Sequence, residues 1–261
     1  MKNPRKYGIA PYKVAVVHGG PGAPGEMAPV ARELASEWGV LEPFQTADTI
    51  EGQVRELWDV LSTNGEPEIK LVGYSWGAWL SAIFAARYPS VVGKLILIGS
   101  GPFEEKYARD IMNERLCRLG DAERQEVLSV IESFNAKGSG DMNRKMARFG
   151  RLISMADSYD PMHHADEVVG MQFDIFKSVW READELRRSG ELLQIMKKIN
   201  CPVTAIHGDF DPHPAMGVEK PLVSRLNDFR FILINNCGHT PWIERQARTQ
   251  FFNVLREELR K

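Results

Sequence analysis

The sequence has few cysteines, no long hydrophobic run and no excess of either charge. Its 261 residues include only three cysteines, Cys117, Cys201 and Cys237, at wide spacings. An odd, widely spaced set excludes a disulfide framework and a CxxC metal site, and it favours a reducing compartment, so we expect a cytoplasmic protein. No segment approaches the ~20 apolar residues of a membrane-spanning helix. The first residues also lack the apolar stretch of a secretory signal.

The charge balance excludes further classes of partner. There are 33 Lys and Arg against 35 Asp and Glu, which leaves a formal net charge of −2. A dedicated binder of nucleic acid or of an anionic membrane normally carries a basic surplus, so we expect neither partner. At 43% hydrophobic residues the chain can bury a substantial core without disulfides or a structural metal. Nothing in the sequence indicates an oligomeric state.

What the sequence does contain is an alternation of short apolar runs with segments of helical spacing. The runs at 13–18, 40–41, 69–73, 94–99, 202–207 and 229–234 predict six strands. Strands that are apolar on both faces and alternate with helices indicate a parallel sheet covered by helices. Between 101 and 200 the pattern changes to charged, helix-forming stretches. We therefore expect an α/β core made of residues 1–100 and 201–261, with a helical cap inserted at 101–200.

The strongest motif is Gly73-Tyr74-Ser75-Trp76-Gly77, which matches G-x-S-x-G between a predicted strand and a predicted helix. A sharp turn there holds the serine in a strained conformation, and side chains at the two glycine positions would clash. The turn would expose the Ser75 hydroxyl at the carboxyl edge of the sheet, which makes it the candidate nucleophile.

A second motif, His18-Gly19-Gly20-Pro21-Gly22, also follows a strand. A nucleophilic serine requires backbone donors for the oxyanion, and a glycine-rich loop lets the main chain come close. The candidate donors are the N–H groups of Gly20 and Trp76. A plain Gly-Pro turn is the alternative, and a phosphate loop is disfavoured because no G-K-[ST] follows.

The remaining candidates are an acid and a base after the last two strands. Asp211 follows the run at 202–207 and His239 follows the run at 229–234. Parallel strands end on one side of a sheet, so both should lie at the edge that carries Ser75. We expect His239 to accept the Ser75 proton and Asp211 to orient His239. Asp209 competes with Asp211 for the acid role.

The same segment also alternates groups that can bind metals. His207, Asp209, Asp211 and His213 are spaced by two residues. Alternation at a strand end sends neighbouring side chains to opposite faces, and the predicted triad already uses Asp211. We therefore expect no metal site, and the proposed chemistry requires no cofactor.

Taken together, the His-Gly-Gly-Pro-Gly loop and the Gly-x-Ser-Trp-Gly turn resemble the α/β-hydrolase superfamily, and in particular its proline-iminopeptidase-like branch. The resemblance covers the chain from about Tyr12 to Lys261. It implies an α/β-hydrolase fold with Asp211 as the acid, Gly20 and Trp76 as oxyanion donors, and a cap over the active site. Only about a dozen residues precede Val14, so we expect an N-terminally trimmed, mostly parallel sheet of six strands rather than eight.

Substrate contacts are less well defined by this resemblance. The branch uses cap carboxylates to bind a substrate amine, for which Glu182, near Trp180, is one candidate and Glu104 and Glu105 are others. Trp180 itself, Gly19 within the glycine-rich loop and Trp242 near the base complete the expected substrate-binding set. The family's Asp-Gln-Arg-Gly-x-Gly-x-Ser stretch is absent, since residues 41–49 read Leu-Glu-Pro-Phe-Gln-Thr-Ala-Asp-Thr.

The function we predict is hydrolysis of a small ester or amide through an acyl-enzyme. The first alternative is a proline-iminopeptidase-like aminopeptidase that acts on short peptides. The second is a ligand-binding protein without activity, which would normally have lost a triad residue, whereas this chain contains all three.

Overall fold

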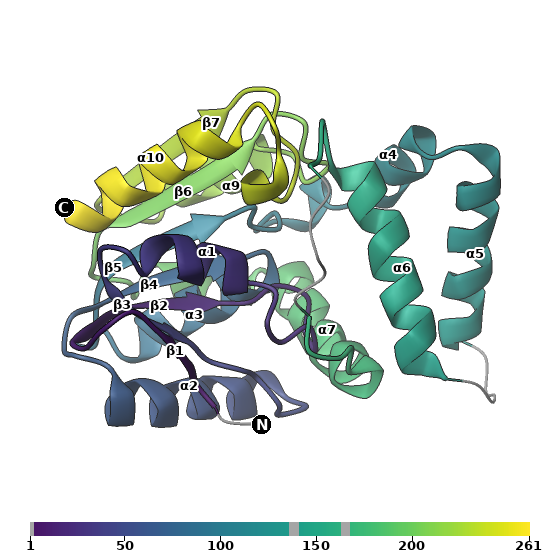
Figure 1. The fold of residues 1–261 in the computed structure, drawn as a ribbon. Coiled ribbons are helices and arrows are strands. Elements are labelled where there is room, and N and C mark those ends of the chain that lie inside the picture. The colour runs from purple at the N-terminus through teal and green to yellow at the C-terminus, as the bar shows by residue number, and fades with distance from the viewer. Residues whose placement is uncertain (1–2, 136–140, 163–167) are drawn as a thin grey trace.

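The computed structural model describes residues 3–135, 141–162 and 168–261 (Figure 1). Residues 136–140 and 163–167 of the predicted cap lie outside this description. Among the described helices, none is both long enough and apolar enough to cross a membrane.

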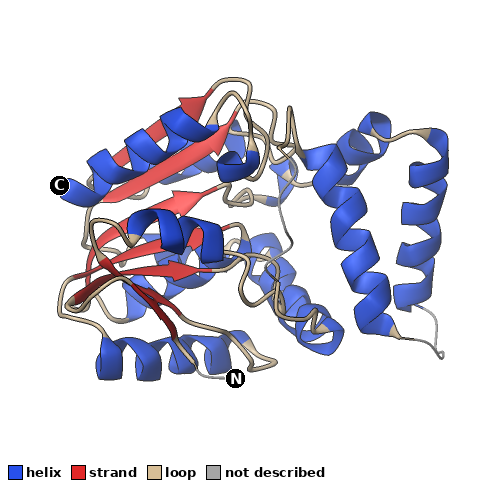
Figure 2. Ribbon diagram, viewed as in Figure 1, coloured by secondary structure: helices blue, strands red, loops and turns tan. Residues whose placement is uncertain are grey.

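In the described part of the chain, seven strands form one sheet with helices on both sides (Figure 2). Their order across the sheet is β1-β3-β2-β4-β5-β6-β7. Their bounds are β1 (Arg5–Tyr7), β2 (Tyr12–Val17), β3 (Gly39–Glu42), β4 (Ile69–Tyr74), β5 (Val92–Ile98), β6 (Val203–Gly208) and β7 (Phe229–Ile234). The strands from β3 to β7 in this order are parallel. The predicted α/β fold with a mostly parallel sheet is therefore confirmed.

The expected number of six strands is wrong by one. The additional strand is β1, which pairs antiparallel with β3 at the edge of the sheet. Its three residues are Arg5, Lys6 and Tyr7, so it carries no run of apolar side chains. Backbone pairing holds this edge strand together with the polar contacts of Arg5 and Tyr7 to Glu42, and neither leaves a hydrophobic periodicity in the sequence to detect.

Two layers of helices cover the sheet because its strands bury alternate residues on opposite faces. Leu71, Leu95 and Leu97 belong to the hydrophobic cluster on one face, and Val72 and Ile96 belong to that on the other. The first face packs against α2 (Ile50–Asn64), α3 (Trp76–Arg87), α7 (Phe173–Arg188), α8 (Glu191–Met196) and α9 (Met216–Val223). The second packs against α1 (Ala28–Leu34) and α10 (Arg248–Arg260).

The inserted segment divides into two parts by its packing. Helices α7 and α8 contribute Val179, Ala183 and Leu192 to the same cluster as α3. Helices α4 (Ile111–Arg118), α5 (Asp121–Asn135) and α6 (Met142–Asp157) lie together to one side of the sheet (Figure 1), and they share a separate small hydrophobic cluster. Its buried members are Leu119, Val127, Leu152 and Ala156. Among the described residues of the insertion, helices α4 to α6 therefore have a hydrophobic core of their own, whereas α7 and α8 pack on the core of the sheet.

Candidate active site

Ser75 occupies the turn between β4 and α3, in a backbone conformation that side chains rarely adopt. Its φ is 52° and its ψ is −117°. A Cβ atom on Gly73 would lie 2.2 Å from the carbonyl oxygen of Gly77. A Cβ atom on Gly77 would lie 2.4 Å from the carbonyl oxygens of Val17 and His18. Both glycines are therefore required by close backbone approach, as the motif predicts.

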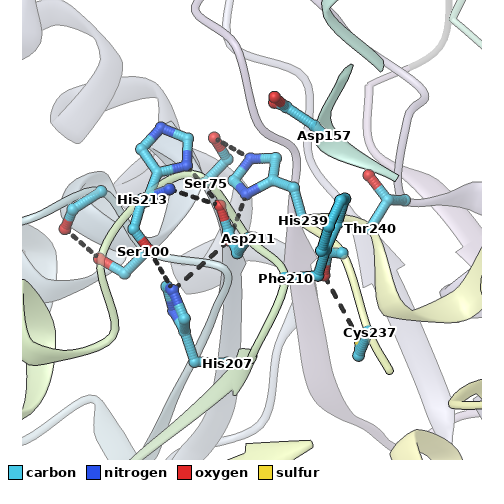
Figure 3. A network of polar contacts seen from close by, with 12 residues as sticks. Ser75, Ser100, Asp157, His207, Phe210, Asp211, His213, Cys237, His239 and Thr240 are labelled. Carbon is cyan, nitrogen blue, oxygen red and sulfur yellow. Dashed lines mark hydrogen bonds and ion pairs between the residues drawn. The ribbon is translucent and has the colours of Figure 1, made fainter. Parts of the chain in front are cut away.

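The structure brings Ser75, His239 and Asp211 into one line (Figure 3). Nε2 of His239 lies 3.1 Å from the Ser75 hydroxyl oxygen, and Nδ1 of His239 lies 2.7 Å from Oδ2 of Asp211. The pairings of Gly73 with Leu97, of Ile98 with Ile206 and of Gly208 with Ile234 set the ends of β4 to β7 level. The loops that carry the three side chains consequently meet at the carboxyl edge of the sheet.

Burial and the neighbouring charges shift the pKa values of Asp211 and His239 in opposite directions. Burial alone would raise the pKa of Asp211, but the facing His239 and His213 imidazoles hold that pKa well below its usual value. Burial alone would lower the pKa of His239, but the Asp211 carboxylate raises it above its usual value. An ionised Asp211 stabilises the imidazolium that forms when His239 accepts a proton. The arrangement can therefore deprotonate a serine hydroxyl during nucleophilic attack.

Asp209, the other candidate for the acid, makes its hydrogen bond to the backbone of the loop before His239. Its Oδ1 accepts a hydrogen bond of 3.1 Å from the backbone N–H of Cys237, in the loop that leads to His239. Asp211, His213 and His239 do place potential metal-ligating atoms within 4.8 Å of one another. The Asp211 carboxylate already pairs with Nδ1 of each imidazole at 2.7 Å.

The two candidate oxyanion donors border the same space. Gly20 and Trp76 both line the cavity into which Ser75 opens. Trp76 is the first residue of α3, and backbone N–H groups in the first turn of a helix have no intrahelical acceptor. Its indole Nε1 donates to Oε1 of Gln53 at 3.0 Å, which fixes the orientation of the ring.

The cavity has a volume of about 370 Å³ and lies between the sheet edge and the cap. Its core side is lined by Ser75, His239 and Trp79, and Trp180 of α7 lines it beside Trp79. Its cap side is lined by apolar side chains that include Met112, Met146, Phe149 and Ile153. The Trp79 and Trp180 rings are stacked, with an interplanar angle of 5° and centroids 6.1 Å apart. An apolar group of several carbon atoms would be well accommodated here.

The expected substrate-binding residues separate into two groups. Trp180 lines the cavity, whereas Gly19, Glu182 and Trp242 are not among its lining residues. Oε2 of Glu182 accepts the N–H of Ile50 at 2.8 Å, at the start of α2. The backbone N–H of Gly19 donates to Glu26, and the Trp242 ring packs edge-on against Tyr74 with centroids 4.6 Å apart.

Sequence reasoning missed the charged residues of the cap that reach the site. Nε and Nη2 of Arg115 donate to the two carboxylate oxygens of Asp157, both at 2.7 Å. Both residues line the cavity, and the carbonyl oxygen of Asp157 accepts the N–H of His239 at 2.8 Å. Both residues lie in charged helical stretches, so no motif distinguishes them. His213, by contrast, was visible in the sequence as part of the alternating His and Asp segment.

A serine, a histidine and a carboxylate aligned at the carboxyl edge of a parallel sheet, with helices inserted above them, define an α/β-hydrolase-like protein. The family model described as the alpha/beta hydrolase fold matches residues 14–246, and the chain belongs to this family.

Individual proteins that resemble this chain share only a low sequence identity with it. The chain is 26% identical over 208 residues to monoacylglycerol lipase ABHD6 of Homo sapiens, an alignment that covers 77% of this chain and 58% of that protein. Among solved structures, VinJ superposes with a TM-score of 0.67 at 17% identity, covering 98% of this chain and 94% of that one. Proline iminopeptidase of Mycobacterium smegmatis gives a TM-score of 0.60 at 17% identity, with coverage of 98% and 94%. At these identities the structural likeness establishes the fold.

Proposed function

We propose that this protein is a serine hydrolase that cleaves small esters through an acyl-enzyme. The observation that carries the proposal is the line from Ser75 through His239 to the buried Asp211 at the base of an apolar cavity. His239 accepts the Ser75 proton as the hydroxyl oxygen attacks the substrate carbonyl. The backbone N–H groups of Gly20 and Trp76 stabilise the resulting oxyanion. His239 then protonates the departing alcohol, and water repeats the cycle on the acyl-enzyme.

The preference for an ester over a peptide rests on the charged groups of the cavity. An aminopeptidase needs a carboxylate that can bind a free amine. Glu182 is held at the start of α2, and Asp157 is paired with Arg115. The wall of aromatic and aliphatic side chains instead supports an apolar acyl group. The relative named as a monoacylglycerol lipase supports the same substrate class.

The alternative activity, that of a proline-iminopeptidase-like enzyme, has a specific observation in its favour. Glu26 lines the cavity beside Gly20 and Pro21, so a carboxylate does lie close to the reacting atoms. One of its oxygens accepts the N–H of Gly19 at 3.0 Å. Cleavage of prolyl amides in preference to esters would select this alternative.

We also propose a cytoplasmic setting with a small-molecule substrate. All three cysteines, Cys117, Cys201 and Cys237, are free thiols, which supports a reducing compartment.

The test is reaction with a serine-directed fluorophosphonate, followed by a substrate panel. The wild type should be labelled at Ser75, and Ser75→Ala should not be labelled. The panel compares p-nitrophenyl esters of increasing acyl length with prolyl naphthylamide. Asp211→Asn should lower kcat about 10⁴-fold. Asp209→Asn is the matched control and should keep near wild-type kcat, because its amide oxygen can still accept the Cys237 N–H. Failure of the wild type to react would favour a ligand-binding protein without activity.

A further inference from the structure

Asp211 is held by two histidines rather than one. Its Oδ2 faces Nδ1 of His239 at 2.7 Å, and its Oδ1 faces Nδ1 of His213 at the same distance (Figure 3). The backbone N–H of His213 also donates to Oδ1, at 2.9 Å. The Asp211 side chain is completely buried, so water cannot substitute for either partner. The rings of His213 and His239 pack against each other, with centroids 4.6 Å apart.

These contacts determine the tautomer of His213. Burial lowers the pKa of His213 to about 4, although Asp211 acts in the opposite direction, so the ring is neutral at pH 7. A neutral imidazole that faces a carboxylate through Nδ1 must carry its proton on Nδ1. The other nitrogen, Nε2, lies 3.5 Å from Nη2 of Arg115, a donor, which is consistent with an unprotonated Nε2. His213 therefore donates a hydrogen bond to Asp211 without adding a charge.

The backbone of His213 is in turn held by a hydrogen bond to a side chain of strand β6. The backbone carbonyl of His213 lies 2.7 Å from Nε2 of His207, on β6. Because a carbonyl oxygen can only accept, His207 carries a proton on Nε2 and donates it. Nε2 of His207 also lies 3.6 Å from Oδ2 of Asp211. A rigid strand thus anchors the loop that supplies both donors to Oδ1.

We propose that His213 is a positioning residue, whose Nδ1–H fixes the plane of the Asp211 carboxylate so that Oδ2 points at His239. One backbone donor on Oδ1 would still let the carboxylate rotate about its Cβ–Cγ bond. A second donor on the same oxygen, from a ring that is itself packed against His239, removes that freedom. The inference rests on the proposed function, since it concerns the efficiency with which His239 activates Ser75.

The test compares two substitutions of different donor capacity. His213→Phe keeps an aromatic ring against His239 and loses the donor. His213→Asn loses the ring and places an amide donor near the position of Nδ1. Hydrogen-bond partners of metal ligands typically contribute ten- to hundredfold in affinity or activity, and we expect a loss of kcat of about that size on a p-nitrophenyl ester in His213→Phe. KM should change little, and His213→Asn should recover most of the rate.

Two further measurements separate positioning from a general loss of structure. Labelling of Ser75 by the fluorophosphonate should slow in His213→Phe by the same factor as kcat. The thermal midpoints of the two variants should not follow the order of their rates. If the phenylalanine variant does not fold, His213→Leu makes the same comparison, because leucine is smaller and also lacks a donor.

The experiments distinguish a failure of the role proposed for His213 from a failure of the proposed function. Wild-type kcat in His213→Phe, or equal losses in the Phe and Asn variants, would overturn the positioning role while Ser75 still reacts. Failure of the wild type to react at Ser75 would overturn the proposed function, and the role of His213 with it.

Discussion

Breaking the ion pair between Arg115 and Asp157 should destabilise the protein strongly. The two side chains are only 14% and 5% exposed, and two hydrogen bonds of 2.7 Å join them. Arg115→Met keeps an unbranched apolar side chain and removes the charge, which leaves the Asp157 carboxylate buried without its partner. Removing one partner of a buried pair costs about 3–5 kcal/mol. At a slope of about 3 kcal/mol per molar urea, the unfolding midpoint should fall by about 1–1.7 M.

The matched control is the double variant Arg115→Met/Asp157→Leu. Replacing a buried ion pair by apolar residues of similar volume is often neutral or stabilising, so the double variant should recover most of the loss. Urea unfolding followed by circular dichroism measures all the variants, with Asp157→Leu completing the cycle. A fall of less than about 1 kcal/mol in Arg115→Met would refute the reasoning, because it would mean that water already solvates the pair.

Arg115 and Asp157 should also shift the pH dependence of activity, because both act on the pKa of His239. Asp157 acts to raise the pKa of His239, and Arg115 acts to lower it. A protonated His239 cannot accept the Ser75 proton, so activity declines as the pH falls through the pKa of His239. Arg115→Met should therefore move the acid limb of kcat/KM to higher pH, and Asp157→Asn should move it to lower pH. Shifts in the same direction would contradict this assignment of signs.

Three further substitutions test the turn, the cavity and the acid stability of the fold. Gly77→Ala should destabilise the protein by about 3 kcal/mol in urea unfolding, because its Cβ would overlap carbonyl oxygens at 2.4 Å. Ile153→Trp should narrow the cavity, lowering kcat/KM for long-chain p-nitrophenyl esters more than for the acetate ester; equal losses would place the acyl group elsewhere. Burial would raise the pKa of Glu258, but hydrogen bonds from Lys261 and Lys94 lower it to about 2. Its ionised form thus stabilises the fold above the usual value of 4.5, and this contribution is lost between pH 4.5 and 2. Glu258→Gln should reduce that acid dependence in a thermal-midpoint series.

The parts of the fold that could be predicted are those whose signal is local. A strand segment buried on both faces must be apolar throughout, as Leu95–Ile98 of β5 is, and that run is visible in the sequence. The strand β1 has no such requirement, because it lies at the edge of the sheet. Its backbone pairs with β3, and its Arg5 and Tyr7 side chains make polar contacts with Glu42. The error in the strand count therefore follows from the difference between a strand at the edge of the sheet and one at its centre, since only the central strand must be apolar.

The site residues likewise divide into those whose position follows from the sheet and those whose position depends on helix packing. Ser75, Asp211 and His239 follow strands of one parallel sheet, so their meeting follows from topology alone. Glu182 was expected at the substrate because it lies near Trp180 in the sequence. On helix α7, however, Trp180 faces the cavity while the Glu182 carboxylate accepts the N–H of Ile50. Which residues of a cap helix reach a site depends on how that helix packs, and sequence proximity does not report it.

The end of α6 shows how closely the cap and the proposed base are joined. The carbonyl of Asp157 accepts the N–H of His239 at 2.8 Å. The buried Glu244 carboxylate accepts the N–H groups of Tyr159 and Asp160, just beyond α6, and also that of Gly238, next to His239. A displacement of the cap that pivoted at this point would remove donors from Glu244 and move His239 away from its partners. The cap and the sheet edge therefore form one framework at this end of α6. Helix α5, which packs within the separate α4–α6 cluster, takes no part in these hydrogen bonds.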